Sequence, residues 1–238
     1  MVIESNRLLS GILLIIVLLT CFFLKLDYLI LILLSTLVIF DLYKSNFINV
    51  FYDYILIAIS IFTFLFIYDE IKLLNILNVF FIICVLLNIF FRNFYFNKIF
   101  ILSILIFLLN LYTVFIFDRD YLYFVIFIAF FNDTIAYISG KSIKGPLIIP
   151  SISPNKTWSG TLISFFLTLL LLFKLDINFF VGILLSSSLF FGDIFFSYVK
   201  RKKNIKDFSS LIKGHGGILD RLDSMFFFTI ILNFYFLI

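Results

Sequence analysis

"IFILSILIFLLNLYTVFIF", residues 99–117, contains no charged side chain. It is long enough to cross the hydrocarbon core of a bilayer as a helix, which needs about 20 apolar residues. The whole chain has the same character, since 63% of its 238 residues are hydrophobic and only 13% are charged. A soluble domain carries roughly 25% charged residues. This composition excludes a soluble globular domain and predicts an integral membrane protein.

Short polar segments on either side of this stretch divide the chain into apolar runs of near-spanning length. The runs cover residues 8–24, 28–40, 47–67, 73–91, 99–117, 121–138, 160–173, 178–199 and 224–238. The sequence therefore predicts an all-α, polytopic integral membrane protein with about nine transmembrane helices. Arg7 precedes the first run as in a signal peptide, but the small-residue cleavage site is absent. This run is interpreted as the first span.

Lysine and arginine fall mostly on one side of the nine-span arrangement. Only Lys25, Lys72, Arg119 and Lys174, out of 18 such residues, lie on the side opposite the N-terminus. Positive charge marks the cytoplasmic face of a membrane protein. The distribution predicts a cytoplasmic N-terminus and cytoplasmic loops at residues 139–159 and 200–223. It also predicts a multi-pass protein of the inner (plasma) membrane whose functional site faces the cytoplasm.

The two halves of the chain differ in backbone-shaping residues. All three prolines, Pro146, Pro150 and Pro154, lie in one loop, and all of the nine glycines except Gly11 follow residue 139. Glycine and proline are used where the backbone conformation is specified. The pattern predicts a membrane scaffold of five spans in residues 1–120, which could provide a dimer face. It predicts a catalytic membrane domain in residues 121–238. Cys21 and Cys84 lie inside apolar runs and are interpreted as small buried hydrophobic residues.

Two carboxylates stand among apolar residues, Asp133 in "AFFNDTIAY" and Asp193 in "LFFGDIFFS". An ionised carboxylate in such a place costs roughly 2.5–3.5 kcal/mol. Either these acids reach the interface near a span end, or they face a cavity that holds water or a metal ion. Helical spacing places Ser197 and Lys200 on the same face as Asp193, so one polar stripe leads from the acid to the basic loop.

A second pair of carboxylates, Asp220 and Asp223, shares one face at the start of the last span. Together with Asp193 they form a plausible oxygen cage for Mg²⁺, a hard cation that takes carboxylates and substrate phosphates. The alternative is that lysines pair with these acids for stability alone. The glycines of "KGHGG", residues 213–217, favour the first interpretation, because a glycine-rich loop lets backbone N–H groups approach a phosphate. The neighbouring Lys200, Arg201, Lys206 and Lys213 indicate a bound polyphosphate.

The loop "GKSIKGPLIIPSISPNKTWSG", residues 140–160, is stiffened by its prolines and carries three lysines. "SGKS" is not a P-loop, because Ile135 stands where that motif needs glycine. Trp158 is interpreted as an interfacial anchor. His215, the only histidine, is interpreted as a phosphate hydrogen-bond donor or loop organiser. A phosphate nucleophile is already anionic at neutral pH and needs no general base.

Residues 197–224, "SYVKRKKNIKDFSSLIKGHGGILDRLDS", resemble the signature of the phosphatidate cytidylyltransferases, also called CDP-diglyceride synthetases. The matching positions are Ser197, Lys200, Arg201, Lys206, Asp207, His215, Gly216, Gly217, Asp220, Arg221 and Asp223. Residues 132–160 resemble a second block of that family, and "GDIFFSYVKR" matches the stretch between. The departures are Lys213 in place of proline, Ser159 in place of an acidic residue, and the reversed order of Lys144 and Gly145.

The resemblance implies that phosphatidate attacks the α-phosphorus of CTP, giving CDP-diacylglycerol and pyrophosphate with Mg²⁺; a second cation is left open. The implied metal ligands are Asp193, Asp220 and Asp223, with Asp133 as a further candidate. The implied catalytic residues are Lys200, Arg201, Lys206, Asp207, His215 and Arg221. The implied substrate-binding residues are Lys141, Lys144, Ser153, Asn155, Lys156, Thr157, Ser197, Gly214, Gly216 and Gly217. The expected partners are CTP, phosphatidate and membrane lipid, without nucleic acid; a homodimer is left open.

Other functions are compatible with parts of this pattern. A CTP-dependent polyprenol or dolichol kinase-like enzyme would transfer the γ-phosphate instead of the cytidylyl group. An ion-coupled transporter would also place acids inside the membrane, but no second copy of the glycine- and proline-rich half is visible. An inactive relative is disfavoured because retained charges without function would cost stability.

Overall fold

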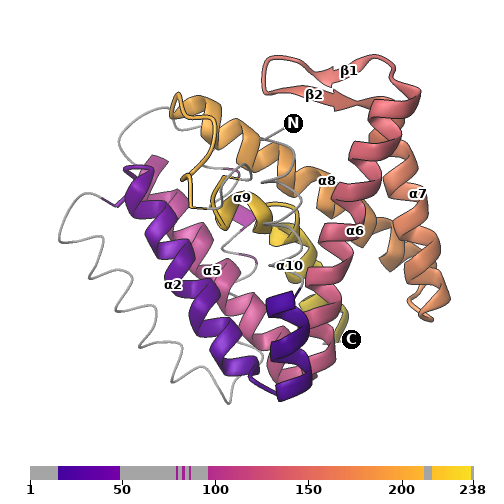
Figure 1. The fold of residues 1–238 in the computed structure, drawn as a ribbon. Coiled ribbons are helices and arrows are strands. Elements are labelled where there is room, and N and C mark those ends of the chain that lie inside the picture. Colours follow the sequence, from indigo (N-terminus) through magenta and orange to yellow (C-terminus); the bar gives the residue numbers. More distant parts are fainter. Residues whose placement is uncertain are drawn as a thin grey trace.

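The computed structural model describes residues 16–48, 79, 82–83, 86, 96–211 and 216–236 (Figure 1). Residues 16–24 are helical and lead into the first labelled helix, α2. The labelled elements are α2 (Asp27–Lys44), α5 (Phe96–Phe117), α6 (Arg119–Ile143), β1 (Leu147–Ile149), β2 (Ser153–Thr157), α7 (Trp158–Lys174), α8 (Phe179–Lys202), α9 (Leu219–Leu222) and α10 (Met225–Phe236).

The helices coincide with the predicted spans wherever the structure describes them. Runs 28–40, 99–117, 121–138, 160–173, 178–199 and 224–238 correspond to α2, α5, α6, α7, α8 and α10. Of run 8–24, residues 16–24 are helical, while runs 47–67 and 73–91 lie almost entirely outside the described residues. The total of nine spans and the cytoplasmic N-terminus therefore stay predictions.

Within the described ranges, α5, α6 and α8 are long and apolar enough to cross a membrane. Helices α7 and α10 are apolar but shorter. An all-α membrane protein is thus confirmed in its main feature, with one addition in the loop predicted at residues 139–159. There α6 continues to Ile143, and β1 and β2 form an antiparallel hairpin in which Leu147 pairs with Thr157.

Local residues explain where these elements begin and end. Asp118 separates α5 from α6 and caps α6 by accepting a hydrogen bond from Asp120 N at 3.0 Å. Lys144 ends α6 with a φ of 60°, and Pro146, which has no N–H to donate, follows after Gly145. Thr157 caps α7 by accepting from Gly160 N at 3.2 Å.

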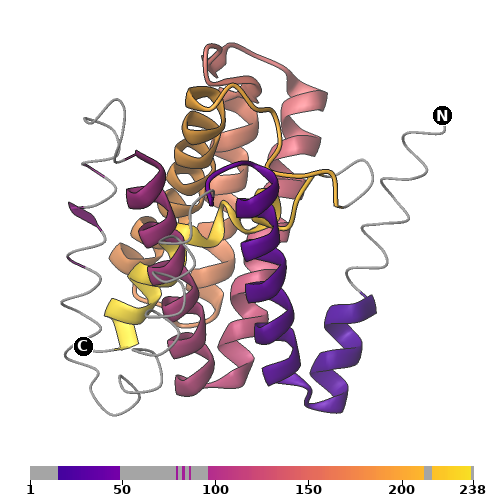
Figure 2. The same cartoon turned by 90° about the vertical axis from the view of Figure 1, so that its left-hand side faces the viewer.

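The larger helices pack in a closed order. Helix α6 packs against α7, α7 against α8, α8 against α10, α10 against α5, and α5 against α6. Helix α2 lies against α5 and α9, and the hairpin projects at one end of the bundle (Figures 1 and 2). Because α5 contacts both α6 and α10, the predicted scaffold and catalytic halves share one helix bundle, and their division of function stays a prediction.

Phenylalanine side chains fill the core between α5, α8 and α10. Phe100, Phe196 and Phe226 are fully buried, one on each helix. Phe208, from the connection between α8 and α9, stacks on Phe100 with ring centroids 5.9 Å apart. It also meets Phe196 edge-on at 6.0 Å. These phenylalanine contacts hold the α8–α9 connection against the bundle and so position the charged residues on either side of Phe208.

Candidate active site

The polar stripe predicted on α8 is present. Ser197 Oγ donates to Asp193 Oδ1 at 3.4 Å, one turn apart on the same face. Lys200 follows one turn later and is only 9% exposed. Lys200, Arg201 and Lys202 form the last turn of α8, where positive charge interacts favourably with the helix dipole. The helix thus carries an acid and a buried ammonium group toward the α8–α9 connection.

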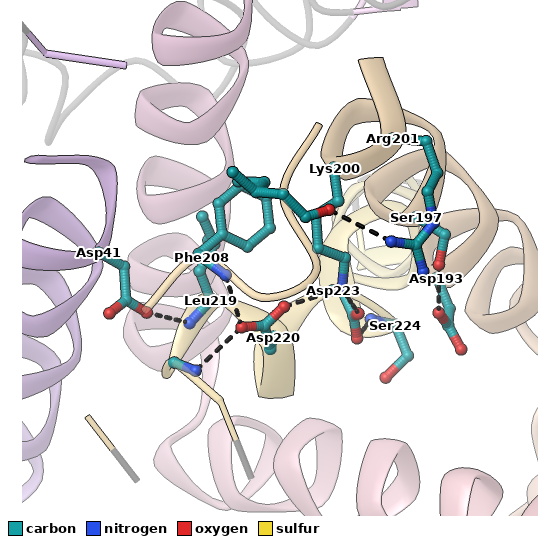
Figure 3. Close-up of polar contacts among 12 residues, drawn as sticks. Asp41, Asp193, Ser197, Lys200, Arg201, Phe208, Leu219, Asp220, Asp223 and Ser224 are labelled. Atoms are coloured by element: carbon teal, nitrogen blue, oxygen red, sulfur yellow. Dashed lines mark hydrogen bonds and ion pairs between the residues drawn. The ribbon is translucent and has the colours of Figure 1, made fainter. Parts of the chain in front are cut away.

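Lys200 joins the beginning of residues 197–224, here named the signature segment, to its end (Figure 3). Its Nζ lies 2.8 Å from Asp220 Oδ1 and 3.8 Å from Asp223 Oδ2. All three side chains are nearly inaccessible to solvent. Removing one partner of such a buried set leaves an uncompensated charge, so the three residues act as one unit.

Asp220 also organises the backbone of the connection. Its Oδ2 accepts hydrogen bonds from Phe208 N at 3.0 Å and Gly217 N at 2.9 Å. Gly216 adopts a φ of +79°, and a Cβ there would lie 2.8 Å from Asp220 Oδ2. The Gly217 N–H predicted to bind a phosphate therefore contacts a carboxylate here. The substrate-binding roles of Gly216 and Gly217 stay predictions.

Three carboxylates from different elements share one electrostatic neighbourhood. Burial raises the pKa of Asp223 well above its ordinary value, and the charges of Asp193 and Asp133 raise it further. Lys200 and Lys156 oppose this shift. Lys156 forms an ion pair with Asp193 Oδ2. The lysine ammonium groups thus supply the positive charge that a cluster of acids requires.

The hairpin brings its predicted residues to α8. Lys156 on β2 reaches Asp193, and Arg201 Nε donates to Ile152 O at 3.1 Å, which ties the hairpin turn to the end of α8. Ser159, which stands where an acidic residue is common, donates to Lys144 O and so closes the base of the hairpin. Two cationic side chains therefore hold the hairpin against α8, Lys156 from the hairpin and Arg201 from the helix.

Other predicted residues lie at the edge of this cluster. Lys141 lies over the Tyr137 ring, 5.7 Å from its centroid. Ser153 pairs with Ile149 in the hairpin, Thr157 caps α7, and Asn155 is exposed. Lys206 and Asp207 are exposed and Arg221 is half-buried. Lys213, Gly214 and His215 lie outside the described residues.

Three residues of the site were missed from the sequence. Asp41 on α2 is fully buried and accepts hydrogen bonds from the signature segment. It ends an apolar run in "VIFDLYK", so the argument applied to Asp133 could have found it. Gly192 lies against the backbone of Asp223, and only its place beside Asp193 could have indicated it. Phe208 could not be singled out among 37 phenylalanines.

As placed here, no three histidine, cysteine, aspartate or glutamate side chains of the described residues are grouped to hold a metal ion. Asp220 is engaged by three protein donors. Asp133, Asp193 and Asp223 are the three acids that interact electrostatically with one another. Their assignment as metal ligands, like that of Asp220, stays a prediction.

Comparison with known proteins agrees with the resemblance in the signature segment. The sequence model described as "Cytidylyltransferase family" matches residues 5–238. A phosphatidate cytidylyltransferase of Rickettsia conorii is 38% identical over 116 residues, which cover 42% of this chain and 50% of that protein. Those of Helicobacter pylori and Staphylococcus aureus are 41% and 37% identical, over 40% and 48% of this chain and 39% and 47% of the relatives. In these matches the chain spans about half the length of its relatives or less. The family match extends over nearly the whole sequence, and the chain belongs to the cytidylyltransferase family.

Proposed function

We propose that this protein transfers the cytidylyl group of CTP to phosphatidate and so makes CDP-diacylglycerol. The relatives bear the name phosphatidate cytidylyltransferase. The observation that carries the proposal is the buried set of Lys200, Asp220 and Asp223, which joins the two ends of the signature segment. Burying a charged unit at the end of an apolar helix costs desolvation free energy, so its presence there favours a role in binding or chemistry.

In the proposed reaction an oxygen of the lipid phosphate forms a bond to the α-phosphorus of CTP. The bond from this phosphorus to the β-phosphate oxygen breaks, and pyrophosphate leaves with the electron pair. No proton needs to be removed from an anionic nucleophile, so positioning and charge neutralisation are the main requirements. Positive charge comes from three elements. Helix α8 provides Lys200 and Arg201, the hairpin provides Lys156, and α9 provides Arg221.

The chemistry of these carboxylates is that which Mg²⁺ prefers, because it takes carboxylate oxygens together with substrate phosphates. Asp193 and Asp223 would hold it with Asp133, while Asp220 keeps its contacts to the backbone. Mg²⁺ would neutralise charge on the triphosphate. Lys156, which pairs with Asp193 here, would then be released to contact a phosphate.

Asp193→Asn is expected to raise the Mg²⁺ concentration for half-maximal activity by roughly tenfold, because one anionic ligand is lost. The measurement is a Mg²⁺ titration of product formation at saturating CTP and phosphatidate. Asp176→Asn serves as the control, since Asp176 is exposed in the turn before α8. An unchanged Mg²⁺ requirement in Asp193→Asn would remove Asp193 from the metal site.

The reaction itself is tested with CTP labelled at either the α- or the γ-phosphorus. Purified protein, phosphatidate and Mg²⁺ should carry α-label into the organic phase and leave γ-label in the water phase as pyrophosphate. Asp220→Asn should lower α-label transfer by about 30-fold, since hydrogen bonds to a charged group contribute roughly 1.5–3 kcal/mol. A parallel assay replaces phosphatidate with a polyprenol. Transfer of γ-label to the polyprenol would instead establish a kinase. No lipid-soluble label with either substrate would refute both enzyme assignments.

The side of the membrane is also part of the proposal. The lysine and arginine distribution supports a site on the cytoplasmic face of the inner membrane, where CTP is available. The lipid substrate would come from the same leaflet, next to the apolar surfaces of the helices that carry the site.

A further inference from the structure

We propose that Asp41, on a helix far from the signature segment in sequence, positions that segment for the reaction. This inference rests on the proposed function, because it concerns the same site. Asp41 lies near the end of α2, and its side chain reaches the connection between α8 and α9. Figure 3 shows it on one side of this connection, with Asp193 and Ser197 on the other.

Both oxygen atoms of the Asp41 carboxylate accept a hydrogen bond from the signature segment. Its Oδ1 accepts a hydrogen bond from Ser209 Oγ at 2.6 Å, and its Oδ2 accepts from Leu219 N at 2.8 Å. The side chain is fully buried, with 0% of its residue surface exposed. A buried donor without its acceptor costs more than the hydrogen bond contributes, so the buried Leu219 N–H depends on this one group.

The position of Leu219 connects Asp41 with the buried ion set. Leu219 is the first residue of α9, and Asp220 follows it directly. Asp41 holds the Leu219 N–H, while Asp220 holds the N–H of Gly217 and of Phe208. Two carboxylates, Asp41 on α2 and Asp220 itself, therefore fix the backbone that leads up to Asp220, the residue that meets Lys200.

Gly217 supports the same conclusion. A Cβ at this position would lie 2.7 Å from Asp41 Cγ, closer than two carbon atoms of different residues can approach. The segment can lie against Asp41 only because residue 217 has no side chain. A glycine predicted to approach a phosphate thus approaches a carboxylate of another helix.

Asp41 could instead be a simple anchor of α2, and α2 itself provides the control. Asp27, at the other end of the same helix, is 7% exposed and accepts hydrogen bonds from Tyr123 Oη at 2.6 Å and Arg119 at 3.1 Å. Its partners belong to α6 and not to the signature segment. Loss of either carboxylate should weaken α2 packing, but only loss of Asp41 should disturb the reaction.

The experiment compares Asp41→Ala, Asp41→Asn and Asp27→Ala in the full chain. For each variant, kcat, KM for CTP and the melting temperature of the protein in detergent are measured. Asp41→Ala should lower kcat/KM by about 30-fold and Asp41→Asn by about fivefold, since asparagine retains one acceptor oxygen. The kcat/KM of Asp27→Ala should stay within about threefold of wild type, even if its melting temperature falls as far as that of Asp41→Ala. Equal losses of activity in Asp41→Ala and Asp27→Ala would reduce Asp41 to an anchor.

A double-mutant cycle tests the contact itself. Gly217→Ala alone should reduce kcat/KM, and the same change in the Asp41→Ala background should cost much less, because the colliding carboxylate is gone. Additive losses would overturn the proposed contact.

A readout without activity separates this inference from the proposed function. Lys206 is exposed near the start of the connection, so trypsin cleavage after Lys206 reports release of the segment. Asp41→Ala should be cut at least about fivefold faster than Asp27→Ala, because cleavage follows the population of opened states. Faster cleavage in a protein that makes no CDP-diacylglycerol would support the positioning role and refute only the function. Equal cleavage rates would overturn the positioning role whatever the reaction is.

Discussion

Replacing Lys200 with methionine is expected to lower kcat/KM for cytidylyl transfer by at least about a thousandfold. The ammonium group is the only one that contacts both Asp220 and Asp223 among the described residues. Methionine would keep the packing against the Phe208 ring, which lies 5.6 Å from Nζ, but would leave two buried carboxylates without their cation. Loss of one preorganised charged group in a site costs roughly 10²–10³ in rate, and the freed carboxylates would also change position.

Lys203→Met is the matched control for this prediction. Lys203 follows the same helix, donates to Asn46 O at 3.2 Å and lies 4.7 Å from the centroid of the Phe47 ring. The ion pairs of Asp220 and Asp223 among the described residues are with Lys200 and not with Lys203. Its replacement should leave kcat/KM within about threefold of wild type, as expected for a change away from the site. A similar loss in both variants would show that the general charge of this helix end matters more than the buried set.

Stability must be separated from chemistry in this comparison. Breaking a buried ion pair by removing one partner costs about 3–5 kcal/mol, so Lys200→Met should also melt at a lower temperature. The double variant Lys200→Met/Asp220→Asn removes one of the stranded charges and should recover part of the melting temperature. It should not recover activity. Recovery of both would mean that Lys200 serves the fold and not the reaction.

The helices could be predicted from the sequence because their cause is local. Runs such as 99–117 have no charge to interrupt them, and polar residues such as Asp118 and Asn178 stand where the helices are capped. The β-hairpin could not be predicted in the same way. Strands of three and five residues have no useful periodicity, and the contact of Arg201 with Ile152 O joins the hairpin to a helix distant in sequence.

The residues of the site could be predicted better than their partners. The spacing of Asp193, Ser197 and Lys200 follows from helix geometry, and the structure confirms that they share a face. The assignment of partners depends on tertiary packing. Nothing in the spacing of Asp220 shows that it binds Lys200 and two backbone N–H groups, or that Asp41 reaches Leu219 from a helix 178 residues away.

Gly192→Ala is expected to reduce kcat/KM by about a hundredfold through the position of Asp223. A Cβ at residue 192 would lie 2.5 Å from Asp223 O and 3.0 Å from Ser224 O. Both atoms belong to the backbone and cannot rotate away, so α8 and the start of α10 would have to separate. A displacement of about 1 Å at a catalytic group can cost roughly 10²-fold in rate, and Asp223 is the residue that would move.

Gly182→Ala on the same helix separates this steric effect from that of adding a methyl group to α8. Its Cβ would lie 3.0 Å from Leu169 Cδ1, the end of a flexible side chain. Alanine is favoured over glycine within a helix by about 1 kcal/mol, so this variant should be as stable as wild type and fully active. Gly192→Ala should instead be destabilised by about 1–3 kcal/mol, as overpacked cores are. Measuring melting temperature, kcat and KM for both variants distinguishes the two cases. Because the collision is with the backbone at Asp223, a Gly192→Ala enzyme that kept wild-type kcat would show that α8 and α10 can separate without disturbing the reaction. The position of Asp223 in the buried set would then not limit the rate.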